Sequence, residues 1–153
     1  MDEEIINKNR NINRGYRKLD IWKESVELFG FVKKKMDMLT NLNSKIKSQI
    51  EASIFGVNSN IAEGYCRRHL KENIRFSNIA LASLGENYSQ IFTLLNANII
   101  DKNWFDEYDK MHYALENKII NYIKQQIKMV KDDIDWKNDY LIKELNIRYT
   151  DSP

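Results

Sequence analysis

The chain has 153 residues, 30% of them charged, and a formal net charge of +2, which suits a single domain with a core of its own. Its five glycines and single proline are too few for the turns of a β-sandwich or a doubly wound sheet, so the predicted fold class is all-α. The one cysteine excludes an internal disulfide, and no apolar run approaches the roughly 20 residues of a membrane span. Because the first residues also lack the pattern of a signal peptide, we expect a cytoplasmic protein without a membrane partner.

The N-terminal part of the chain is basic. Residues 1–17 are polar and rich in asparagine, and they carry Arg10, Arg14 and Arg17, which predicts a flexible basic arm. The bias continues further, since residues 5–50 hold eleven Lys or Arg against four Asp or Glu. Such a segment favours contact with nucleic acid or acidic lipid, although charges scattered over solvated helix faces are also common.

Four segments have apolar residues at spacings of three and four, which predicts four amphipathic helices at about residues 19–39, 45–63, 70–97 and 104–130. Rods of roughly 30–40 Å joined by short loops predict an antiparallel up-and-down four-helix bundle over residues 18–131. The expected core stripes are Trp22, Val26, Phe29, Val32 and Met36; Ile46, Ile50, Ile54, Val57 and Ile61; Leu81, Leu84, Tyr88, Ile91 and Leu95; and Tyr108, Met111, Leu115, Ile119, Tyr122, Ile123 and Ile127.

Residues that begin or end helices occupy the connections. Short polar side chains in residues 40–44 predict a cap for the second helix, and Asp101 or Asn103 is the expected cap of the fourth. Gly64 is expected to end the second helix in a left-handed C-terminal cap. Residues 132–153 form a C-terminal extension that is expected to be a short fifth helix or a docking segment for a partner.

Few residues suit catalysis. Asp109 and His112 have the i, i+3 spacing of di-iron bundles, but the second carboxylate–histidine pair is missing because His69 lies at a helix corner. We therefore expect His112 on the surface, and neither a metal nor another cofactor. No arginine–histidine spacing of helical toxin ribonucleases, phosphate loop or nucleophile elbow occurs. The two arginines beside Cys66 favour a lowered pKa of its thiol. Because the sequence implies no base nearby, an inert or mildly reactive thiol is expected. The predicted protein is not an enzyme.

What remains is a set of surface cations. Lysine and arginine contact phosphate oxygens, and the planar guanidinium also stacks on bases. Bundles that bind no nucleic acid carry comparable lysines, so this signal alone is of moderate specificity. The cations predicted to contact nucleic acid are Lys33, Lys34, Lys35, Lys45, Lys47, Arg67, Arg68, Lys71 and Arg75.

The middle of the chain carries a specific pattern. It reads NIAEG (60–64), RR (67–68), KExIRF (71–76) and ALxSLxE (80–86), after a first helix that opens on LDIW (19–22). On these residues the chain resembles the bacterial four-helix-bundle family known as intervening-sequence proteins, which are encoded within insertions of 23S ribosomal RNA genes. The resemblance covers about residues 16–130.

The resemblance implies a four-helix subunit of a homopentamer, an architecture similar to that of the accessory protein of diversity-generating retroelements. That accessory protein is basic and works with a reverse transcriptase and its template RNA. The resemblance thus implies an oligomeric, RNA-binding or chaperone-like protein with a reverse transcriptase as partner and the cations of residues 67–75 as contacts. Alternatively, Asn60, Glu63 and these cations hold helices or subunits together, and the protein is an adaptor or scaffold that does not touch nucleic acid.

Overall fold

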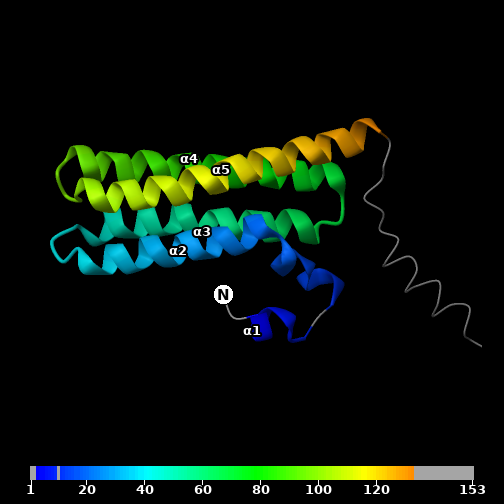
Figure 1. Ribbon diagram of the computed structural model, residues 1–153, viewed down its shortest axis with the longest axis horizontal. Coiled ribbons are helices and arrows are strands. Elements are labelled where there is room, and N and C mark those ends of the chain that lie inside the picture. The colour runs from blue at the N-terminus through cyan, green and yellow to red at the C-terminus, as the bar shows by residue number, and fades with distance from the viewer. Residues whose placement is uncertain (1–2, 10, 133–153) are drawn as a thin grey trace, which may run out of the picture.

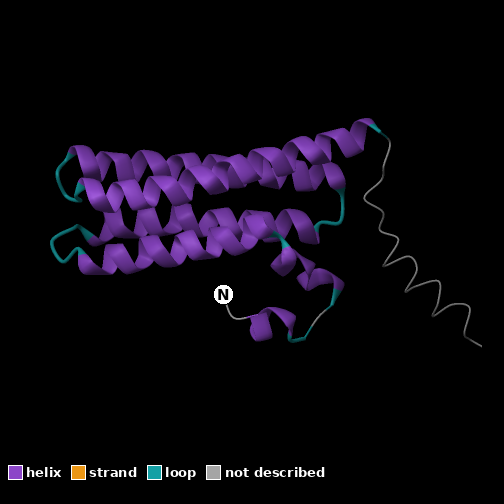
Figure 2. Cartoon of the chain, viewed as in Figure 1, coloured by secondary structure: helices purple, strands orange, loops and turns teal. Residues whose placement is uncertain are grey.

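The computed structural model describes residues 3–9 and 11–132, and this part of the chain consists of helices and short loops, with no strand (Figure 2). The predicted all-α class and the four predicted helical segments are therefore confirmed, with ends displaced by three residues or fewer. In chain order the helices are α1 (Glu3–Asn7), the 3-10 helix η1 (Ile12–Lys18), α2 (Asp20–Met38), α3 (Ser44–Cys66), α4 (Leu70–Asn96) and α5 (Lys102–Lys131).

The four long helices lie side by side (Figure 1). The α2–α3 and α4–α5 loops lie at one end of the molecule, and the α3–α4 turn lies at the other. Helix α3 packs most extensively against α4, while α2 contacts both α3 and α5. Each long helix can therefore bury an apolar stripe against two neighbours.

Most residues of the predicted apolar stripes face this shared interior. Val32, Ile54 and Ile119, for example, have no exposed surface, and burying a side chain of this size stabilises the fold by about 1.5–3 kcal/mol. Ile46 and Ile127 differ from the prediction, since they are 45% and 40% exposed. Both lie close to a helix end, where neighbouring helices cover less of the surface.

Side chains cap two helices at the α2–α3 and α4–α5 loops. The Oδ1 atom of Asn43 accepts a hydrogen bond of 2.8 Å from a backbone N–H in the first turn of α3. The Oδ1 atom of Asp101 accepts a hydrogen bond of 2.8 Å from the backbone N–H of Trp104 in α5. Of the two predicted caps, Asp101 and Asn103, it is therefore Asp101 that caps this helix. Leu19 and His69, which precede α2 and α4 at the other end, make no side-chain cap.

Gly64 does not end a helix, so that prediction is wrong. Helix α3 continues to Cys66, and it is Arg68 that takes the left-handed conformation, with a φ of 55°. Gly64 is buried against α4, where a Cβ would lie 2.8 Å from the Cβ of Phe76 and 3.4 Å from the Cα of Asn73. Glycine is needed here because α3 and α4 approach each other too closely for a side chain.

Small residues of α4 make a second close contact with α3. Ala80 is fully buried, and a Cβ on Gly56 would lie 3.3 Å from the Oγ atom of Ser83. Ala82 and Gly85 are instead exposed. A Cβ on Gly85 would meet nothing within 4 Å, so no neighbouring helix of the described chain requires this glycine.

The predicted flexible arm, residues 1–17, includes most of η1 (Ile12–Lys18), which instead packs against α2 and α3 near the α3–α4 turn (Figure 1). The ring of Tyr16 lies 5.2 Å from that of Trp22, which is partly buried. Arg17 donates hydrogen bonds of 3.0–3.3 Å to backbone carbonyls within residues 5–9, so a cation of the expected arm instead fastens α1 to η1.

The predicted C-terminal extension lies outside the described residues except for Asp132, which follows α5. Within residues 3–9 and 11–132, none of the helices combines the length and the apolar character that crossing a membrane requires.

Candidate nucleic-acid interface

The nine predicted cations fall into two groups at opposite ends of α3. The first group flanks the α2–α3 loop and consists of Lys33, Lys34, Lys35, Lys45 and Lys47. The second surrounds the α3–α4 turn and consists of Arg67, Arg68, Lys71 and Arg75. The 23 residues of α3 separate the two groups by about 34 Å, so they do not make one continuous surface.

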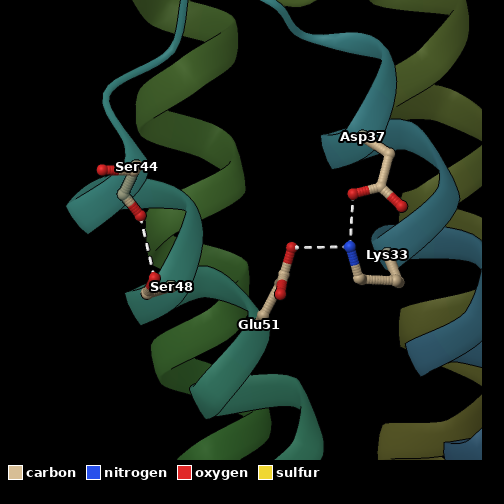
Figure 3. A network of polar contacts seen from close by, with 5 residues as sticks. All are labelled: Lys33, Asp37, Ser44, Ser48 and Glu51. Atoms are coloured by element: carbon tan, nitrogen blue, oxygen red, sulfur yellow. Dashed lines mark hydrogen bonds and ion pairs between the residues drawn. The ribbon is translucent and has the colours of Figure 1, made fainter.

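Acidic residues offset part of the first group. The ammonium group of Lys33 lies between Asp37 and Glu51, at 3.4 Å from the latter, as Figure 3 shows. The hydrogen bond to Asp37 is the main reason why the pKa of Lys33 is raised. Lys35 pairs with Glu107 of α5 at 3.6 Å. Two of the five lysines, Lys33 and Lys35, are thus paired with carboxylates. Glu51 and Glu107 are the carboxylates that come from other helices.

Two arginines of the second group share one aromatic ring. The guanidinium of Arg67 lies 5.2 Å from the ring centroid of Phe76, and that of Arg75 lies 5.9 Å from it. Each also contacts an acid of its own turn, Glu63 at 2.5 Å and Glu72 at 3.7 Å. Both arginines remain more than half exposed, so their outer N–H groups can still donate to phosphate oxygens.

Arg68 and Lys71 differ sharply in their surroundings. Arg68 donates to the backbone carbonyl of Ile12 and lies 4.5 Å from the ring centroid of Tyr65. It therefore attaches η1 to the end of α3 and is less available to a ligand than predicted. Lys71 is exposed, and it forms no ion pair within the described residues.

Helix α5 adds to the second group cations that were not predicted from the sequence. The amide of Asn73 donates to the hydroxyl of Tyr122 at 3.2 Å, which sets the last turns of α5 beside the start of α4. Lys124, Lys128 and Lys131 lie on these turns and extend the second group. Their spacing of four and three residues places these lysines on one face of α5. This pattern could have identified them in the sequence, because cations near the C-terminal end of a helix face the negative end of its dipole.

The described chain therefore divides into two halves of different charge. The basic half comprises residues 11–24, 60–76 and 117–132, with twelve Lys or Arg against five Asp or Glu. The acidic half comprises residues 25–59 and 77–116, with seven against nine. The excess of cations gives the basic half a positive potential, which attracts polyanions.

The sequence model of the 23S rRNA-intervening sequence protein family matches residues 17–121. The chain belongs to this family. The match extends from the end of η1 into α5 and includes Gly64 and the cations of the α3–α4 turn, but it stops before Lys124. The resemblance drawn from the sequence is thus confirmed as a family assignment. A comparison with curated proteins gives no match.

His112 is buried in this family member, so the expectation of a surface histidine is wrong. Only 3% of the residue is exposed, and its Nε2 atom lies 3.0 Å from the carbonyl oxygen of Leu84. It follows Tyr108 by four residues and precedes Leu115 by three, which places it on the core stripe of α5. Within the described part of the chain, no group of three or more His, Cys, Asp or Glu could hold a metal ion.

The surroundings of Cys66 agree with the inert or mildly reactive thiol predicted from the sequence. Burial raises the pKa of its thiol, and the opposing effect of Arg68 is smaller. The Sγ atom lies 3.2 Å from the backbone carbonyl of Asn13 and donates to it. The thiol therefore stays protonated at neutral pH and helps to hold η1 in place.

Proposed function

We propose that this protein is a non-catalytic, chaperone-like RNA-binding protein whose basic half contacts the phosphate backbone. The observation that carries the proposal is the excess of cations in that half, gathered by the fold from three separate parts of the chain. The family's name, which refers to 23S rRNA, supports RNA as the polyanion. Binding of this kind releases counterions and is therefore sensitive to salt.

The contacts proposed first are Arg67, Lys71 and Arg75, which are exposed at the α3–α4 turn. Two guanidinium groups near one aromatic ring suit a phosphate backbone with a neighbouring base, because arginine both donates to phosphate and stacks. Lys124 and Lys128 of α5 continue the same surface. The cations at the α2–α3 loop are proposed as secondary contacts at most.

The proposal includes an assembly. We propose that α2 to α5 form an antiparallel up-and-down bundle, and that copies of it associate in the cytoplasm as a homo-oligomer, a pentamer by resemblance to the family. Exposed apolar side chains on α3 and α4 support such association, since Phe55 is 55%, Ile79 38% and Phe92 50% exposed. A reverse transcriptase is the proposed partner by resemblance alone.

Binding of a fluorescently labelled single-stranded RNA of mixed sequence, followed by anisotropy, tests the nucleic-acid contact. Replacing Arg67, Lys71 and Arg75 together by alanine is expected to weaken binding on the order of 100-fold near 0.1 M salt. The slope of log K against log salt should fall by roughly two, because three phosphate contacts to a single strand are lost. The matched control replaces Lys33, Lys34 and Lys35, which also removes three charges, and should change affinity less than about threefold.

The proposed interface is wrong if both triple variants lose affinity equally or if neither does. Equal losses would show that only net charge matters. Far-UV circular dichroism of each variant distinguishes a lost contact from a lost fold.

A protein-interaction adaptor or scaffold is the second candidate, and an apolar groove favours it. The groove has a volume of about 570 Å³ and lies between the start of α3 and the end of α4. Ile46 and Ile99, which line it, are 45% and 40% exposed. If the groove joins copies of the chain into a scaffold of this kind, replacing both residues by lysine should lower the mass measured by light scattering, and the unaltered chain should show no salt-sensitive binding of RNA.

A further inference from the structure

A small pocket opens between α4 and α5, in the acidic half of the molecule. Its volume is about 190 Å³, and it lies away from the cations proposed to contact RNA. Two tyrosines, a histidine, two carboxylates and a glycine line it: Gly85, Tyr88, Asp109, His112, Tyr113 and Glu116.

The floor of the pocket is a buried histidine with one nitrogen unused. The Nε2 atom of His112 lies 3.0 Å from the carbonyl oxygen of Leu84. A carbonyl oxygen can only accept, so Nε2 carries a proton, and in the tautomer that holds this proton alone Nδ1 offers a lone pair. No hydrogen bond joins Nδ1 to any described residue, although the side chain is almost completely buried. The pocket that His112 lines gives this acceptor a place for a donor.

Two carboxylates add further acceptors. Asp109 precedes His112 by three residues and Glu116 follows it by four, so all three lie on one face of α5. Both acids are partly buried, and neither forms an ion pair within the described residues. Their neighbours on the same helix, Asp106 and Glu107, pair with lysines instead. The pocket thus holds two negative charges without a cation.

The walls are aromatic, and one side is open. The ring of Tyr88 lies 4.9 Å from the ring of His112, and Tyr113 is 64% exposed at the rim. Burial, then the charge of Asp109 and a hydrogen bond to its carboxylate, raise the pKa of Tyr88, so this phenol stays neutral and shares Asp109 with any ligand. Gly85 leaves the α4 side free, since a Cβ there would meet nothing within 4 Å. Aromatic faces and carboxylates both attract cations.

We propose that this pocket binds an organic cation, the guanidinium or ammonium head of an arginine, a lysine or a free alkylamine. Acceptors, negative charge and aromatic faces meet in one cavity, and each favours a ligand that donates hydrogen bonds and carries a positive charge. A metal ion fits less well, because the described residues offer no cluster of three His, Cys, Asp or Glu that could hold one. The cavity is also large enough for a head group with part of its aliphatic stem.

Calorimetric titration of the full chain with agmatine, which carries a guanidinium and an ammonium group at the two ends of a butyl chain, tests the proposal. Agmatine should bind, whereas n-butylurea, which carries neither charge, should not. Glu116→Gln and Asp109→Asn should each weaken agmatine binding about tenfold or more, because each removes one of two charges around the ligand. Asp106→Asn is the matched control on the same helix and should change the affinity less than about twofold.

A second variant and a second ligand sharpen the test. Gly85→Leu should block the pocket and abolish binding while the thermal unfolding midpoint is kept or raised, since this glycine is exposed within a helix. Tighter binding of N-acetyl-arginine amide than of agmatine would identify a protein side chain as the source of the cation, and the reverse would identify a free amine. Equal binding of n-butylurea, equal loss in Asp106→Asn, or no binding of agmatine would overturn the proposal.

Discussion

The basic and acidic halves contain the same kinds of charged residue, yet they differ in what surrounds each cation. In the acidic half, Lys33 and Lys35 each meet a carboxylate from another helix. In the basic half, Lys118 of α5 pairs with Glu24 of α2 in the same way, but Lys71 is exposed and forms no ion pair within the described residues, and further lysines of α5 lie at the same end of the molecule. We therefore propose that three consecutive lysines make a weaker polyanion site than cations that only the fold brings together.

Reversing the charge of two lysines on α5 is expected to have the largest effect on RNA binding. Lys124→Glu together with Lys128→Glu should weaken binding of the labelled RNA on the order of 100-fold, through two lost contacts and new repulsion. Lys102→Glu with Lys110→Glu makes the same change of charge in the acidic half. This control should stay within about threefold of the wild type. Equal effects of the two pairs would show that the halves are not distinct.

A comparison of two helical glycines tests the close packing that builds the basic half. Gly64→Ala should lower the free energy of unfolding by about 1–3 kcal/mol, because the new Cβ would press on Phe76 of α4. Gly30 is exposed within α2, and a Cβ there meets nothing within 4 Å. Gly30→Ala should therefore raise the stability by about 0.5–1 kcal/mol. Urea titration measures both, and a neutral Gly64→Ala would contradict the tight contact.

Helix caps distinguish the ends of the molecule on a smaller scale. Asp101→Ala should lower the free energy of unfolding by about 1 kcal/mol, because it removes the cap of α5. His69→Asn should do the opposite and add up to about 1 kcal/mol, because α4 begins without a side-chain cap. Thermal unfolding at pH 7 measures both changes. A stabilising Asp101→Ala would contradict the role given to this aspartate.

The smallest expected effect concerns Cys66. Since burial raises the pKa of its thiol, the thiolate fraction at pH 8 is lower than that of an exposed cysteine. Alkylation by iodoacetamide should therefore be several-fold slower than for free cysteine at pH 8, and the rate should still rise above pH 9. Mass spectrometry follows the reaction. A rate that levels off below pH 8 would indicate a lowered pKa instead.

The four long helices were predictable because their signal is local. Spacings of three and four place residues such as Ile54 and Ile119 on one face wherever the helix ends up. The cap at Asp101 was predictable for the same reason, since its hydrogen bond spans only three residues.

Features that depend on a neighbouring helix were not predictable. Gly64 has the sequence signature of a helix end, but the closeness of α4 decides its role. His112 has acidic neighbours along the chain, but its place on the stripe of Tyr108 decides its burial. The partner of Lys35 is 72 residues away in sequence, so only the fold reveals that the lysine is occupied. The structure therefore restricts the candidate site from the nine predicted cations to the cations at one end of the molecule.

The separation of charge along α3 also affects how the protein meets a partner. A rod about 34 Å long with a positive and a slightly negative end has an electric dipole along its axis. In the field of a polyanion this dipole orients the molecule before contact, so the α3–α4 turn arrives first. An end-on approach keeps the long sides of the rod unobstructed.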